Sequence, residues 1–262
     1  MVFILFLICL LASSIGAIVG AGGGVIIKPV MDLFGLMPVS TVSFLSGATV
    51  LCMSIVSLIR TWNSGAKVKL KTSTPLAIGA VAGGLVGKWL LETVKSGFGN
   101  EKTLGMIQAI ALTVITFLVF LYVCNKNKLP SKHVESPFVA VIIGCCLGII
   151  SSFLGIGGGT SNVAVLFFFF SMEAKEAAKN SIYIIVFSQL ASIITSAVSG
   201  TIPSFQWYQL VAMVAGGVGG ALVGAEISKR INNQKVELLL KILLIVITCI
   251  DFYNIIKFAF LV

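Results

Sequence analysis

The sequence predicts an all-α, polytopic integral membrane protein, and three observations support this prediction. First, 58% of the 262 residues are apolar and only 10% are charged, whereas soluble domains carry about 25% charged residues. Second, the chain divides into apolar runs of the length that crosses a bilayer as helix. Third, one such run in each half contains a glycine-rich break, at Gly20–Gly24 and at Gly155–Gly159.

The apolar runs are bounded by charges, prolines and polar clusters. In order they cover residues 1–35 (interrupted), 38–59, 74–91, 103–124, 137–170 (interrupted), 177–199, 205–227 and 236–260. Each uninterrupted run has about the 17–25 residues that a helix needs to span the hydrocarbon core. Helix is expected because open strands leave backbone groups unpaired in lipid. No Lys or Arg precedes the first run, so we interpret it as part of the fold rather than as a cleaved signal peptide.

The second half of the chain repeats the features of the first in the same order. The pattern G-x-G-G-G occurs twice, 135 residues apart, and in each half a segment with a serine near its start follows it. These segments begin with Val42-Ser43 and with Asn180-Ser181. An internal repeat of this kind is common among secondary transporters.

Two later features complete the repeat. Glycines spaced by four residues are expected to lie on one helix face and to allow close packing, and a threonine-containing segment follows them. The matching sets are Gly79, Gly83 and Gly87 with Gly216, Gly220 and Gly224, and 113–116 with 245–248. We therefore predict two transmembrane repeats, 1–128 and 129–262, within one membrane domain. Each opens with a Gly-broken helical hairpin followed by three transmembrane helices.

The distribution of basic residues predicts how the repeats are oriented. If each interrupted run is a hairpin that returns to its starting side, twelve Lys and Arg residues lie on the side of Arg60–Lys71 and three lie on the other. If the second run instead crosses once, the counts become eight and seven. The positive-inside rule favours the hairpins, which gives each half an odd number of crossings. The repeats are then inverted, with both termini outside.

The glycine runs are candidate anion-binding elements. Three consecutive glycines break a helix, and where it restarts its first N–H groups are unpaired and carry the positive end of the helix dipole. Such a terminus holds anions without a charged side chain; a purely structural turn is the alternative. Lys28 adds charge unless it snorkels. The candidate substrate-binding residues are Gly22, Gly23, Gly24, Lys28, Ser43, Gly157, Gly158, Gly159, Thr160, Ser161, Asn162, Asn180 and Ser181.

Several function classes are disfavoured by the composition. The net charge of +9 lies in short loops rather than on a basic face, so nucleic acid is not an expected partner. One histidine and no CxxC pair argue against a metal site, and no catalytic or nucleotide motif is present, so neither an enzyme nor a cofactor is expected. The acids Asp32, Glu226 and Asp251 lie near segment ends, which argues against proton coupling through a deeply buried carboxylate.

The duplicated motif resembles that of the TauE/SafE sulfite exporter family of membrane permeases. The motifs stand here as Gly20–Pro29 and Gly155–Gly159, and with the later glycine segments the resemblance spans nearly the whole chain. It implies secondary transport of sulfur-containing or organic anions such as sulfite, thiosulfate or sulfoacetate. The chain departs from the family pattern at Val42-Ser43 and Asn180-Ser181, where Thr-Ser is usual, and at Ala164, which replaces the match to Pro29. These departures leave the substrate open.

The leading hypothesis is a multi-pass permease of the cell (plasma) membrane that carries small anions by alternating access. The two broken hairpins would meet near the midplane and hold the anion through glycine N–H groups. The basic cluster Arg60, Lys67, Lys69 and Lys71 would raise the local anion concentration. An anion channel, an intramembrane enzyme and a non-transporting membrane subunit are the alternatives. A coupling ion, a proton or another ion, and a homo-oligomeric state are left open as further partners beside the anion and the lipid bilayer.

Overall fold

The protein is a bundle of helices in which the predicted spans are present. The computed structural model describes residues 2–63, 68–98, 101–128 and 132–261, and this part of the chain contains helices and no strand. Eight of its helices are long and apolar enough to cross a membrane. The predicted all-α polytopic fold is therefore confirmed. The elements are α1 (Val2–Val19), α2 (Gly24–Phe34), α3 (Val39–Asn63), α4 (Leu70–Phe98), α5 (Glu101–Asn125), η1 (Lys126–Lys128), α6 (Pro137–Leu154), α7 (Thr160–Phe170), α8 (Ala174–Val198), α9 (Trp207–Arg230), α10 (Asn233–Ile256) and η2 (Lys257–Leu261).

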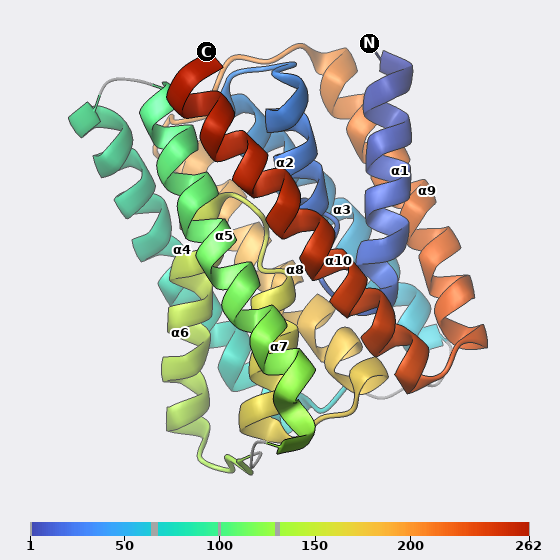
Figure 1. The fold of residues 1–262 in the computed structure, drawn as a ribbon. Coiled ribbons are helices and arrows are strands. Elements are labelled where there is room, and N and C mark those ends of the chain that lie inside the picture. Colours follow the sequence, from blue (N-terminus) through green and yellow to red (C-terminus); the bar gives the residue numbers. More distant parts are fainter. Residues whose placement is uncertain (1, 64–67, 99–100, 129–131, 262) are drawn as a thin grey trace.

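Each half opens with a broken hairpin. Helix α1 is followed after four residues by the 11-residue α2, and α6 is followed after five residues by the 11-residue α7. Three long helices then complete each half. Helix α1 starts at the end of the bundle where both chain ends lie, whereas α6 starts at the opposite end (Figure 1).

The helix contacts are the same in both halves with the halves exchanged. Helix α1 packs against α9 as α6 packs against α4, and α10 packs against α2 as α5 packs against α7. Helices α5 and α10 cross where the Thr248 hydroxyl donates to the Thr116 hydroxyl at 3.2 Å. These two threonines belong to the duplicated threonine segments. The duplication is thus visible in the packing, whereas the boundary at residue 129 lies outside the described residues and stays a prediction.

The glycines spaced by four pack helices closely, as predicted. A Cβ added to Gly83 would lie 1.9 Å from the carbonyl oxygen of Cys145 on α6, and one added to Gly220 would lie 2.3 Å from that of Leu10 on α1. Gly79, Gly87, Gly216 and Gly224 meet carbonyl oxygens of the same two helices at 2.0–2.4 Å. Such small residues let backbones approach in the bilayer, where apolar burial alone does not hold helices together.

Replacing one of these glycines is expected to destabilise the bundle. In Gly83→Ala the new methyl group meets backbone, so α4 and α6 must separate, at a cost of about 1–3 kcal/mol. The apparent Tm of the purified protein in detergent measures this loss. Gly97→Ala in the same helix is the matched control because nothing lies within 4 Å of its Cβ position, and it should be neutral or stabilising by about 0.5–1 kcal/mol. Equal Tm changes for the two variants would contradict the expectation.

Candidate functional site

The six predicted glycines lie at the two helix breaks, and four of them adopt backbone conformations that other residues avoid. Gly22 has φ 57° in the first break. Gly157, Gly158 and Gly159 have φ 81°, 104° and 85° in the second. An L-residue with a Cβ is strained in this left-handed region by about 1–2 kcal/mol, so the breaks require glycine.

The two breaks lie in direct contact. A Cβ on Gly24 would lie 2.1 Å from the carbonyl oxygen of Ile156, and one on Gly159 would lie 1.9 Å from Cγ2 of Val25. Each contact joins the first break to the second, across 132 or more residues of sequence. The absence of side chains therefore allows the two interrupted backbones to touch.

Two apolar side chains support both breaks. Ile185 of α8 lies 2.9 Å from the Cβ positions of Gly22 and Gly158, and Val50 of α3 lies 2.8 Å from that of Gly157. Val50 and Ile185 are 135 residues apart, the same offset as the glycine motifs. The packing around the two breaks is therefore equivalent.

Some N–H groups at the breaks lack a backbone partner. The amides of Ile26 and Ile27 donate to the Gly23 carbonyl. Those of Gly24 and Gly157 have no backbone acceptor among the described residues. Unpaired amides at the start of a helix are the donors that the anion hypothesis requires.

Several predicted polar residues lie at the breaks. Thr160, Ser161 and Asn162 form the buried first turn of α7, and the Ser161 hydroxyl donates to the Gly158 carbonyl at 3.3 Å. The Ser181 hydroxyl donates to the Gly20 carbonyl at 2.6 Å. Cβ of Ser43 lies 2.6 Å from the Cβ position of Gly155. Thr160, Ser161, Asn162, Ser43 and Ser181 are thus brought together with the glycines.

Two predicted site residues are placed elsewhere. The Asn180 carboxamide accepts from the Ser73 hydroxyl at 2.6 Å and from the Lys69 amide at 2.9 Å, so it holds the start of α4. The Lys28 ammonium lies 3.0 Å from a carboxylate oxygen of Asp32, one helical turn further along α2 and away from the break. The proposed contacts of Asn180 and Lys28 with substrate are therefore not supported by the arrangement.

A basic vestibule opens beside the first break. It has a volume of about 320 Å³ and is lined by Arg60, Lys175, Lys179 and Lys229, with Ala17, Ser57, Ala178 and Ser228 among its other residues. No acidic side chain lines it among the described residues. It reaches the break through Ala178, whose Cα lies 2.2 Å from the Cβ position of Gly20. Lys67 of the predicted basic cluster lies outside the described residues.

A narrower serine vestibule opens beside the second break. Its volume is about 40 Å³, room for a few water molecules, and it reaches the break at Gly155. The hydroxyls of three of its serines, Ser43, Ser151 and Ser152, are buried without a described partner. Lys88, ion-paired with Glu92 at 3.1 Å, also lines it. Unpartnered buried hydroxyls are costly unless they serve water or a ligand.

The two vestibules are equivalent positions in the two repeats. Ala178 in the basic vestibule corresponds to Ser43 in the serine vestibule, and Ser57 corresponds to Ser192, each pair being 135 residues apart. They open toward opposite ends of the bundle, since Arg60 and Ser40 lie at opposite ends of the 25-residue α3. The sequence analysis did not find these linings; applying the 135-residue offset to Ser57 and Ala178 would have paired them.

The burial of two acids corrects the sequence analysis. Asp32 and Asp251 were expected near segment ends and therefore near water. Their exposed fractions are only 8% and 1%, because α10 packs its last turns against α2 and the chain continues as η2. The position of these two acids near segment ends therefore does not argue against proton coupling through a deeply buried carboxylate.

Comparisons with known proteins point to one family. A family model described as Sulfite exporter TauE/SafE matches residues 5–250. The chain is 24% identical to the probable membrane transporter protein YunE of Bacillus subtilis, over 94% of this chain and 95% of that one. It is 22% identical to the probable membrane transporter protein YjnA of the same organism, over 91% and 96%. No solved structure matches.

Proposed function

The chain belongs to the sulfite exporter TauE/SafE family and is a multi-pass membrane transporter, and on this premise we propose that it carries small sulfur-containing anions across the plasma membrane by alternating access. Sulfite, thiosulfate and sulfonates are the substrate class. The transporter is expected to work without catalysis. Its two repeats are related by an inverted topology.

One observation carries this proposal. The two glycine breaks touch, and a vestibule leads to each of them from an opposite end of the bundle. In transporters built from inverted repeats, substrate binds where broken helices meet, and access alternates as one repeat moves against the other. The equivalent positions of the two vestibules support this mechanism, because exchanging the conformations of the repeats exchanges the wide vestibule for the narrow one.

The charges of the wide vestibule support an anion as substrate. Four basic side chains line it, and it lies at the end of the bundle that the positive-inside rule assigns to the cytoplasm. Such a field raises the local concentration of anions and speeds their association. Unpaired amides at the breaks and unpartnered hydroxyls in the serine vestibule would then replace the hydration shell.

Flux measurements in proteoliposomes test the proposal. The purified protein should give saturable uptake of radiolabelled thiosulfate or sulfite, and external unlabelled anion should accelerate the release of internal label. This exchange is the property of a carrier whose site faces one side at a time. Uptake that does not saturate and shows no exchange would instead assign the protein as a channel. Absence of flux for every small sulfur-containing anion would end the proposal.

A further inference from the structure

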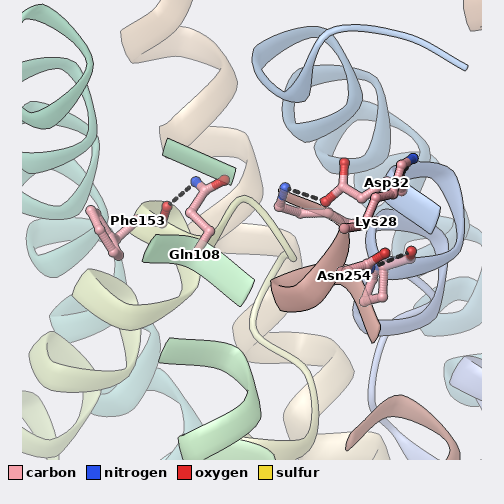
Figure 2. Close-up of polar contacts among 7 residues, drawn as sticks. Lys28, Asp32, Gln108, Phe153 and Asn254 are labelled. Carbon is pink, nitrogen blue, oxygen red and sulfur yellow. Dashed lines mark hydrogen bonds and ion pairs between the residues drawn. The ribbon is translucent and has the colours of Figure 1, made fainter. Parts of the chain in front are cut away.

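A second polar cluster lies away from both vestibules, between α2 and α10. It contains Lys28 and Asp32 on α2 and Asp251 and Asn254 on α10, with exposed fractions of 2%, 8%, 1% and 1%. Figure 2 shows Lys28 and Asp32 beside Asn254. The residues that line the vestibules do not include any of the four. The cluster therefore lies outside both vestibules.

Hydrogen bonds fix part of this cluster. The Lys28 ammonium lies 3.0 Å from Oδ2 of Asp32, and Nδ2 of Asn254 donates to the Pro29 carbonyl at 2.9 Å (Figure 2). The Lys257 ammonium donates to the carbonyls of Asp32 and Leu33 at the end of α2. Asp251 lies three residues before Asn254 on α10, so both share the helix face that contacts α2. Helix α2 is thus joined to the end of α10 and to η2 by one polar cluster.

Three oxygen atoms of this polar cluster have no hydrogen-bond donor. They are Oδ1 of Asp32, Oδ2 of Asp251 and Oδ1 of Asn254, all buried. The ammonium of Lys28 pairs with Asp32 and that of Lys257 donates to backbone carbonyls, so neither donates to the unpartnered oxygen of Asp251. With both acids ionised, these three buried oxygen atoms are left without a donor. Leaving a buried acceptor without a donor costs about 1–3 kcal/mol, so this state calls for an added donor.

The fold itself does not need these charges. In the other repeat, the positions equivalent to Lys28 and Asp32 are Val163 and Phe167, which are 135 residues later. The Thr116–Thr248 contact sets an offset of 132 for the last helices, which makes Val119 the equivalent of Asp251. Val119, Val163 and Phe167 all belong to the apolar core. The same helix contact is therefore made once with apolar side chains and once with charges.

We propose that Asp251, together with Asp32 and Lys28, is a proton-binding site that couples proton movement to anion transport. The proposal rests on the transport function proposed above. A proton on Asp251 neutralises its buried carboxylate and adds one O–H donor to a cluster that has unpartnered acceptors. A metal cation is disfavoured, because the Lys28 ammonium would repel it. Because α2 begins at Gly24, which touches the second break, the charge state of the cluster acts on the helix that forms the substrate site.

No other charged side chain competes for this role in the described neighbours of α10. Helix α1 contains no charged residue. The charged residues of α5 stand at its first two positions, at the end of α5 where Gly105 meets Phe258 of η2, beyond the end of α10. Those of α8 lie in its first two turns, near Asn233 at the opposite end of α10. Lys257 of η2 is the remaining charged neighbour, and it binds the end of α2. A pH response of this region is therefore assigned to Asp251, Asp32 and Lys28.

The test compares the wild type with Asp251→Asn in proteoliposomes. Thiosulfate is the probe because, unlike sulfite, it takes up no proton near neutral pH. An imposed pH gradient should change the initial uptake rate of the wild type several-fold, in opposite directions for the two signs of the gradient. Asp251→Asn should lose this response and retain exchange of labelled for unlabelled thiosulfate. Glu135→Gln, which removes an exposed acid between the repeats, is the matched control and should respond like the wild type.

Two outcomes overturn the coupling site while leaving anion transport intact. One is a wild type that exchanges thiosulfate without responding to the gradient, and the other is an Asp251→Asn variant that still responds. A second measurement does not depend on the substrate. Infrared difference spectra between two pH values should show a buried carboxyl group that gains a proton in the wild type, with its signal absent in Asp251→Asn. Identical spectra for the two proteins would contradict the proposed proton-binding site, whether or not thiosulfate is transported.

Discussion

Gly24→Ala is expected to abolish transport. The added methyl group would lie 2.1 Å from the carbonyl oxygen of Ile156, so the first break cannot stay in contact with the second. The substitution keeps the backbone amide of residue 24, and it therefore tests the contact between the breaks rather than the donors. We expect the exchange rate in proteoliposomes to fall by at least about 100-fold, which corresponds to roughly 2.7 kcal/mol.

A second substitution separates loss of contact from loss of folding. In Gly159→Ala the methyl group would meet Cγ2 of Val25 at 1.9 Å, which is the end of a side chain and can be removed. Gly159→Ala combined with Val25→Ala should therefore recover part of the activity. Recovery stays partial because φ 85° at residue 159 is strained for alanine. No comparable partner exists for Gly24, which meets backbone.

Controls decide how these results are read. Gly219→Ala places its methyl group at an ordinary 3.7 Å from Leu10 and should transport at the wild-type rate. Monodisperse elution in detergent shows whether each variant folds. Near-normal exchange by a folded Gly24→Ala protein would mean that the breaks need not touch, and the proposed substrate site would then be wrong.

The repeat could be predicted from sequence because the effect of glycine on a helix depends mainly on the local sequence. A run of three glycines inside an apolar segment breaks a helix in almost any surroundings, and glycines spaced by four share a face. The pairing of serines was less certain. Ser43 and Ser181 are matched by order in the sequence, but the contacts of Gly20 with Ala178 and of Gly155 with Ser43 set the offset at 135. Ser43 therefore corresponds to Ala178, one turn away from Ser181.

The failures of the sequence analysis concern contacts and burial that depend on how the helices pack. Lys28 and Asp32 stand four residues apart, so their ion pair could have been predicted from helical spacing. Asp251 could not be added to them, because its contact with α2 depends on how α10 crosses the first hairpin. The vestibules likewise combine residues of α3, α8 and α9 or of α3, α4 and α8. Such combinations arise only from tertiary packing.

Reversing charge in the basic vestibule is expected to slow transport from that side. Lys179 and Arg60 line it, and no ion pair joins either of them to a described acid. In the double variant Arg60→Glu, Lys179→Glu two of the four basic residues of the lining become acids, and only Lys175 and Lys229 remain basic. The association rate of an anion then falls by roughly 10- to 100-fold at low salt, within the range that charged clefts contribute.

The measurement is the rate of thiosulfate exchange below saturation, at low and at high salt. At 0.1 M salt, interactions between exposed charges more than about 10 Å apart are largely screened. The difference in exchange rate between the double variant and the wild type should therefore shrink as salt rises. Lys235→Gln is the control, since this exposed lysine starts α10 at the same end of the bundle without lining the vestibule. A loss that is independent of salt would indicate that Arg60 and Lys179 hold the fold instead. Unchanged exchange would show that the anion enters by another route.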